Sequence, residues 1–240
     1  MAITPFPFPS PEVTMPAPAL TPAYRDAYGR INGLVIVGEG LADHHFRQLA
    51  QLLPEDGDEL RRLAAMEGRH AVDFVGCGRQ LAIRPDLPLA RRLFAPLRAL
   101  FNEAFSTTDT VGALVIQCLI VESFAVAAYR CYLPVADAYA APITAAVLAD
   151  EAEHLDYGER QLAARFPAVA APLSRWCERA VPVAMAMLRE VHGDLEVIGI
   201  DPSALVGEFM GCLGTALEAV GFAPRQATRL AARLAAVACG

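Results

Sequence analysis

Two Glu-x-x-His motifs restrict the possible folds of this 240-residue chain more than any other pattern in it: Glu67 to His70, and Glu151 to His154. On a helix, residues three apart lie on one face about one turn apart, so both side chains of a motif can reach the same ion. A single copy would carry little weight, because so short a motif also arises by chance. Two copies in one chain indicate a repeated structural unit.

Each motif follows another glutamate at nearly the same distance. Glu39 precedes Glu67 by 28 residues, and Glu122 precedes Glu151 by 29 residues. All six polar residues interrupt apolar stripes with alternating steps of three and four, so we expect their side chains to point into a core. Two such helix pairs, packed as a four-helix bundle, would bring four carboxylates and two imidazoles to one point, as in di-iron and di-manganese carboxylate proteins.

Four carboxylates buried together need compensating positive charge. All 20 basic residues are Arg, so no Lys is available for this purpose, whereas two divalent ions would cancel four negative charges. Carboxylate oxygens with one imidazole per ion suit iron or manganese better than a structural zinc site, which prefers thiolates. We therefore predict that two metal ions are bound by Glu39, Glu67, His70, Glu122, Glu151 and His154.

The predicted fold class is all-α: a ferritin-like four-helix bundle core with additional flanking helices. Apolar residues recur at helical spacing from about residue 24 onward, and strand signals are poor. Proline and glycine punctuation places helices at 23–53, 57–81, 88–106, 110–132, 137–164, 170–193, 202–220 and 224–238. Residues 1–22 carry seven prolines and are expected to form a disordered or extended arm, and residues 23–240 are expected to form a single domain.

The composition limits the location and partners of the chain. A net charge of −7 argues against nucleic acid, and 55% hydrophobic residues indicate a large core, an apolar cavity or both. The apolar window 111–133 holds Gln117, Glu122 and Arg130, so we predict a buried helix there and at most peripheral contact with a membrane. The N-terminal residues lack a signal-peptide pattern, and the six cysteines form no Cys-x-x-Cys pair, which favours reduced thiols in a cytoplasmic protein.

Other polar residues receive less specific interpretations. His44, His45 and His192 lie outside the repeated pattern and are predicted to be surface or helix-end residues rather than ligands. Tyr129 follows Glu122 by two helical turns. A hydrogen-bonded core tyrosine is the favoured interpretation of Tyr129, and an auxiliary residue near the metals is the alternative.

The sequence resembles the cyanobacterial aldehyde-deformylating oxygenases, also called aldehyde decarbonylases, in one register from about residue 24 to the C-terminus. The matching segments are YRDAYGRIN at 24–32, MEGRH at 66–70, Cys77-Gly78, LIVESFAVAAY at 119–129, YLPVAD at 132–137, DEAEHLDYG at 150–158 and Gly221-Phe222. The six ligands of that family coincide with the six residues predicted above. The chain departs from the family's acidic run around Glu39, and it has Phe46 at a frequent tyrosine position and Pro142 at a frequent basic position. We expect these departures to affect catalytic efficiency and partner docking more than metal binding.

This resemblance implies conversion of a long-chain fatty aldehyde to an alkane one carbon shorter plus formate. It implies two iron ions, with manganese as an alternative, O2 as co-substrate, and electrons from a ferredoxin-type reductant. An acyl-ACP reductase would be the partner that supplies the aldehyde. The alternative function is another ferritin-like di-metal oxidase, namely a ferroxidase, a peroxide scavenger or a radical-generating subunit. A third possibility is a non-enzymatic bundle that binds lipid.

A long aldehyde needs an apolar channel beside the metals. The candidate walls are apolar residues next to the ligands in sequence: Ile31, Leu34, Val35, Gly38, Phe74, Phe94, Phe124, Ala125 and Ala128. Gly38 lies in mid-helix, where glycine costs roughly 1 kcal/mol relative to alanine, which indicates that a substrate or a neighbouring helix needs the space. Cys77 is either a cysteine near this channel, as in the family, or a buried structural thiol.

Overall fold

The computed structural model describes residues 20–239, and their side chains up to residue 234. Helices account for the regular structure, and the described residues contain no β-strand, which confirms the all-α prediction. The long helices are α1 (Pro22–Leu52), α2 (Gly57–Gln80), α3 (Leu87–Ser106), α5 (Glu122–Tyr132), α6 (Ala140–Ala163), α7 (Ala170–Glu190), α9 (Pro202–Val220) and α10 (Pro224–Cys239). Two short helices, α4 (Thr110–Leu114) and α8 (His192–Val197), complete the set. Division of the chain into an arm and one domain stays a prediction, since residues 1–19 lie outside the described part.

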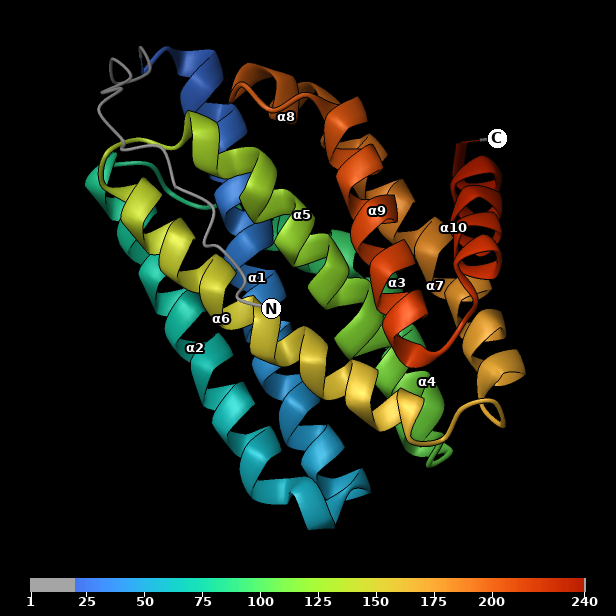
Figure 1. The fold of residues 1–240 in the computed structure, drawn as a ribbon. Helices are drawn as coiled ribbons and strands as arrows, with labels where there is room; N and C mark the ends of the chain where they lie inside the picture. The colour runs from blue at the N-terminus through green and yellow to red at the C-terminus, as the bar shows by residue number, and fades with distance from the viewer. Residues whose placement is uncertain (1–19, 240) are drawn as a thin grey trace, which may run out of the picture.

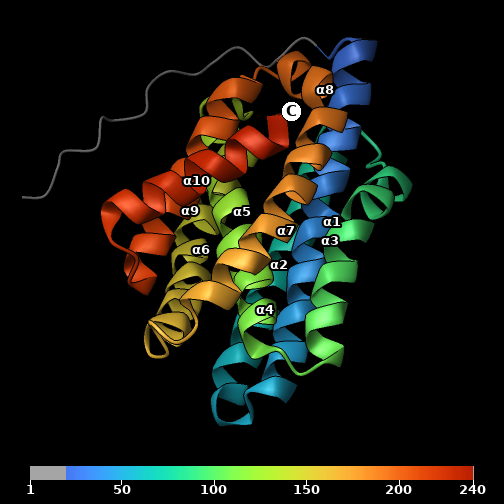
Figure 2. The same cartoon turned by 90° about the vertical axis from the view of Figure 1, so that its right-hand side faces the viewer.

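The core is a bundle of α1, α2, α6 and the segment that ends in α5 (Figure 1). α1 packs along α2 and also contacts α3 and α8, while α5 lies between α6 and α9. α7, α9 and α10 form a layer on one side of this bundle, and α3 lies beside α1 (Figure 2). The four segments that carry the predicted ligands therefore face one another across the centre of the bundle.

Capping residues explain where several helices begin. The Thr21 hydroxyl accepts a hydrogen bond from the backbone N–H of Tyr24, and Pro22 occupies the first turn of α1. The Asp86 carboxylate accepts one from the N–H of Leu89 at the start of α3. These contacts satisfy amide groups that have no partner within the first turn of a helix.

The observed elements differ from the predicted ones in three places. The predicted helix 137–164 begins at Ala140, and the Asp137 carboxylate accepts hydrogen bonds from the N–H groups of Tyr139 and Ala140. The predicted helix 170–193 ends at Glu190, and α8 follows as a separate element. The predicted helix 110–132 is not a continuous α-helix, since Val115–Val121 forms a π-helical segment between α4 and α5.

The π-helical segment packs closely against α6. A Cβ atom at Gly158 of α6 would lie 2.2 Å from the Cβ atom of Cys118, a separation that side chains do not tolerate. Glycine at this position therefore lets the backbone of α6 approach the π-helical segment. The close approach holds two of the ligand-bearing segments together one turn beyond His154.

Within the part of the chain that the structure describes, two segments are long and apolar enough to cross a membrane by length and composition, Thr110–Val135 and Pro202–Val220. The first has 72% of its most apolar window buried inside the protein. Core helices pass the same test, so this finding agrees with the prediction of a buried helix at 111–133. The cytoplasmic location stays a prediction.

Candidate metal centre

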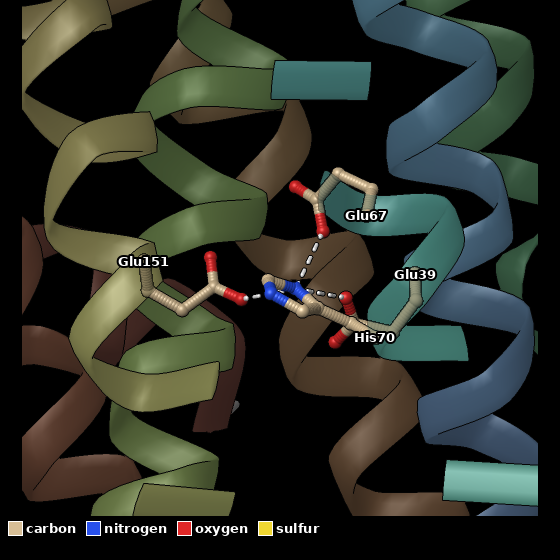
Figure 3. A group of neighbouring side chains, drawn as sticks. All are labelled: Glu39, Glu67, His70 and Glu151. Atoms are coloured by element: carbon tan, nitrogen blue, oxygen red, sulfur yellow. Dashed lines mark ion pairs between the residues drawn. The ribbon is translucent and has the colours of Figure 1, made fainter. Parts of the chain in front are cut away.

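The six predicted ligands meet in the centre of the bundle. Each is at most 4% exposed, and they come from α1, α2, α5 and α6. Figure 3 shows the side chains of Glu39, Glu67 and Glu151 turned toward the imidazole of His70. Residues that lie up to 115 positions apart in the sequence thus form one buried cluster.

Two glutamates of the cluster contact both imidazoles. Glu67 places Oε2 3.4 Å from Nδ1 of His70 and Oε1 3.0 Å from Nδ1 of His154. Glu151 places Oε1 3.5 Å from Nδ1 of His70 and Oε2 2.9 Å from Nδ1 of His154. Each carboxylate therefore spans the gap between the two rings, whose centroids are 5.9 Å apart.

The other two glutamates lie at opposite ends of the cluster. Glu39 Oε2 is 3.3 Å from Nδ1 of His70, and Glu122 Oε2 is 3.9 Å from Nδ1 of His154. The ligand atoms fall into two groups, each within 4.8 Å. The groups are Glu39, Glu67, His70 and Glu151, and Glu67, Glu122, Glu151 and His154. This arrangement could hold a pair of metal ions, with two carboxylates common to both positions.

Burial and mutual contacts divide the protons among these groups. Burial raises the pKa values of Glu39 and Glu122 well above the usual range of a carboxyl, because it disfavours the charged form. Burial opposes charge on Glu67 as well, but close contacts with His154 and His70 outweigh it and lower its pKa to about 2. Glu151 has a lowered pKa, because its contacts with the same two imidazoles outweigh burial and repulsion by Glu67.

The pKa values of both imidazoles are raised. Burial alone would lower the pKa of His154, but contacts with Glu151 and Glu67 raise it to about 9. The pKa of His70 is also raised, because contacts with Glu151, Glu39 and Glu67 outweigh burial. The shifts therefore favour charged imidazoles beside the Glu67 and Glu151 carboxylates.

The hydrogen bonding within the cluster is incomplete. Several buried polar atoms that face one another in the cluster have no hydrogen-bonding partner among the described residues, namely Glu39 Oε2, Glu67 Oε1, His70 Nδ1 and Glu151 Oε1. Buried polar groups without partners are rare in folded proteins and call for an explanation such as a bound ion. Carboxylate oxygens with one imidazole nitrogen per position also match the donor set of iron and manganese. The residues present therefore fit a metal pair.

Three further side chains hold members of the cluster from outside. Asp150, whose side chain is 46% exposed, has Oδ2 3.1 Å from Nε2 of His70. Tyr129 is buried and donates a hydrogen bond to Glu39 Oε1. Gln117 donates to Glu122 Oε1 at 2.6 Å. Such contacts fix the orientation of ligands.

Local sequence patterns do not predict the roles of all these residues. Gln117 stands out only as a polar interruption of an apolar window, and no pattern marks Asp150. The prediction for His44 and His192 is confirmed, since both are exposed. The prediction for His45 is wrong, because its side chain is fully buried and its Nδ1 lies 2.6 Å from Gln117 Oε1. The one sequence signal for burial of His45 is its position next to Phe46, which belongs to the buried stripe of α1.

An apolar cavity of about 850 Å³, part of it open to solvent, adjoins the cluster. All four glutamates line it, and neither His70 nor His154 does, so the cavity reaches the cluster from the carboxylate side. Apart from these carboxylates and the Tyr129 hydroxyl, its lining residues are apolar.

Eight of the nine predicted channel residues line this cavity: Ile31, Leu34, Val35, Gly38, Phe94, Phe124, Ala125 and Ala128. Phe74 instead lines an adjoining cavity of about 500 Å³. Cys77 lines neither cavity; it is buried beside Phe74, and burial raises the pKa of its thiol to about 11. Gly38 lines the cavity and also faces the side chain of Phe94 on α3, because a Cβ at Gly38 would lie 3.2 Å from Phe94 Cζ.

Sequence reasoning also missed one wall of the cavity. α7 contributes three residues to the lining, Ala184, Met187 and Leu188, and Val191 follows directly after this helix. Leu195 and Leu205 contribute from α8 and α9. No local pattern connects them with the cluster, because they carry ordinary helical apolar spacing far along the chain.

Comparisons with known proteins agree with this arrangement. Residues 21–236 match the family model for long-chain fatty aldehyde decarbonylases. The fold is similar to a solved structure from Synechococcus, described as a protein with aldehyde deformylating oxidase activity, with 55% sequence identity and a TM-score of 0.88. The match covers 89% of this chain and 98% of the Synechococcus protein. A family match over most of the chain, together with the all-α ferritin-like fold, establishes that this chain belongs to the long-chain fatty aldehyde decarbonylase family.

Proposed function

We propose that this chain is a di-iron aldehyde-deformylating oxygenase, which converts a long-chain fatty aldehyde to the alkane one carbon shorter plus formate. One observation carries the proposal. Two overlapping groups of buried carboxylate and imidazole ligands lie at the inner end of an apolar cavity. The activity described for the Synechococcus protein supports the same reaction.

In this proposal Glu39 and His70 would hold one iron, Glu122 and His154 would hold the other, and Glu67 and Glu151 would contribute to both positions. The iron pair would supply the redox chemistry that activates O2. Glu67 and Glu151 are assigned to both positions because each of these carboxylates contacts both imidazoles. Manganese remains the alternative metal, since the donor set suits both.

The cavity provides for the rest of the substrate. Because the polar lining is confined to the carboxylates and Tyr129, an aldehyde gains most by placing its carbonyl at the cluster and its hydrocarbon chain along α1, α5 and α7. The same apolar walls disfavour water beside the cluster.

Tyr129 has a defined task in this arrangement. Its ring stacks on Phe74 with centroids 5.3 Å apart and planes at 13°, and its hydroxyl donates to Glu39. The stacked ring fixes the hydroxyl, so Tyr129 holds the Glu39 carboxylate in one orientation at the wall of the cavity.

Electrons must come from outside, because reducing O2 during this cleavage consumes more electrons than the aldehyde provides. A ferredoxin-type reductant and an acyl-ACP reductase that supplies the aldehyde follow from the family resemblance. They are part of the proposal on that basis alone.

The test is turnover of a long-chain aldehyde by iron-loaded protein with O2 and a ferredoxin reducing system. We expect alkane in the headspace and formate in solution, with isotope from labelled O2 in the formate. Replacing His70 or His154 by Ala should lower the iron content and abolish turnover, whereas His192→Ala, an exposed histidine, serves as the matched control. Iron oxidation without aldehyde turnover would favour a ferroxidase, and carbon monoxide as the main co-product would rule out the oxygenase reaction.

A further inference from the structure

Two buried polar side chains outside the ligand set form a chain that ends at the cluster. His45 of α1 and Gln117 of the π-helical segment are both fully buried. His45 Nδ1 lies 2.6 Å from Gln117 Oε1, and Gln117 Nε2 lies 2.6 Å from Glu122 Oε1. Burying two such groups is unfavourable unless they are hydrogen-bonded, as they are here.

The Glu122 carboxylate, at the end of this hydrogen-bonded chain of side chains, sets the direction of its hydrogen bonds. A carboxylate that binds a metal can only accept, so Gln117 must turn its NH2 group toward Glu122. Its carbonyl oxygen then faces His45, which must donate through Nδ1–H. Burial lowers the pKa of His45 to about 3, so the ring is neutral and keeps its single proton on Nδ1.

The π-helical segment places Gln117 in reach of Glu122. The backbone N–H of Glu122 donates to the carbonyl of Gln117, which is the five-residue bond of a π-helix. In an α-helix, residues five apart would point about 140° away from each other, given about 3.6 residues per turn. The π-helical turn therefore aligns the amide with the carboxylate on the same side of the segment.

The ring of His45 is itself held in place. It stacks on Phe101 of α3, with centroids 3.6 Å apart and planes at 7°, and Phe101 is fully buried. The chain thus runs from a ring fixed between α1 and α3, through the π-helical segment, to one end of the ligand cluster.

We propose that His45 is a positioning residue for one of the two metal positions. It fixes the amide of Gln117, which in turn holds the carboxylate of Glu122. Glu122 belongs only to the group that contains His154, and is absent from the group that contains His70. His45 therefore acts on the affinity of the position next to His154, and leaves the position next to His70 unchanged. This inference rests on the proposed two-metal centre.

The test is titration of the metal-free protein with Co(II) under anaerobic conditions, in competition with a chelator, so that the two affinities are resolved. His45→Phe keeps the stacking on Phe101 and removes the N–H donor. We expect one affinity to fall about 3- to 10-fold, the effect of one neutral hydrogen bond, while the other stays at the wild-type value. Gln117→Leu should weaken the same position more, by about 10- to 100-fold.

Two further variants separate positioning from general packing. His45→Asn carries an N–H donor the same number of bonds from the backbone as His Nδ1, so it should restore the wild-type affinity. In a Gln117→Leu background, His45→Phe should have no additional effect, because the residue through which His45 acts is gone. His44→Phe, an exposed neighbour on α1, is the control and should change neither affinity.

The outcomes are distinguishable. Equal weakening of both positions, or additive effects of the His45 and Gln117 substitutions, would overturn the inference and leave His45 as a packing residue. Unchanged affinities in both His45→Phe and Gln117→Leu would overturn it as well. Wild-type protein that binds fewer than two Co(II) ions would contradict the two-metal centre itself, and this inference with it.

Discussion

Adding two divalent ions to the metal-free protein should release about four protons at pH 7, because metal ligands must be deprotonated. The expected number is one proton from each group whose pKa is raised. Burial favours the protonated form of the Glu39 and Glu122 carboxyls. Contacts with carboxylates favour the protonated imidazoles of His70 and His154, and an imidazole that binds a metal must give up that proton. Four positive charges on the ions would then replace four protons.

The release makes metal affinity strongly dependent on pH. With about four protons displaced, the product of the two affinities should rise about 10⁴-fold per pH unit near neutrality, or about 100-fold for each ion on average. The sign follows from the raised pKa values, since a lower pH favours the protonated, metal-free form. Calorimetric titration with Co(II) in two buffers of different ionisation enthalpy measures the number of protons directly.

Two variants identify the source of the protons. Glu122→Gln removes one protonated carboxyl from the cluster, so the release should fall to about three. Glu159→Gln is the control: burial raises the pKa of Glu159 to about 7, but this residue lies outside the cluster, so its replacement should leave the release unchanged. A wild-type release of one proton or none would refute the charge assignment, since it would mean that the cluster is already deprotonated before metal binds.

Three other outcomes are expected. Raising the pH from 7 to 10 should lower the melting temperature of the metal-free protein. The pKa of His154 is raised to about 9, so its ion pairs with Glu67 and Glu151 stabilise the folded state below that pH and are lost as the pH rises through it. An unchanged melting temperature would argue against these pairs. Gly158→Ala should lower the free energy of unfolding by about 1–3 kcal/mol, since its Cβ would lie 2.2 Å from that of Cys118. Chemical denaturation measures this, with Gly207→Ala as the control because nothing lies within 4 Å of a Cβ there. Ala184→Phe should fill the α7 wall of the cavity, so the longest aldehydes lose most turnover while iron content is retained; a uniform loss across chain lengths would contradict the channel assignment.

Much of the helical fold was predictable because its signals are local. Helical periodicity, prolines and capping residues act within a few residues of each other, and they located most helices to within a few residues. The cluster was also predictable, because a polar residue in an apolar stripe must face inward wherever the helix packs. Glu67 and His70 illustrate this, since their spacing alone assigns both to one buried face.

The features that sequence analysis missed depend on contacts between distant segments. Nothing local in 115–121 distinguishes a π-helical segment from an α-helix, and its close packing against Gly158 arises only in the folded chain. His45 became a buried, hydrogen-bonded residue only because α3 supplied Phe101 and the π-helical segment supplied Gln117. The α7 wall of the cavity likewise exists only after the flanking layer has packed onto the bundle. The sequence by itself therefore determined which residues could bind metal, because periodicity sets which side chains face inward. Tertiary structure decided how those ligands are protonated, oriented and reached, because burial, hydrogen bonding and cavity shape arise from groups that meet only in the folded chain.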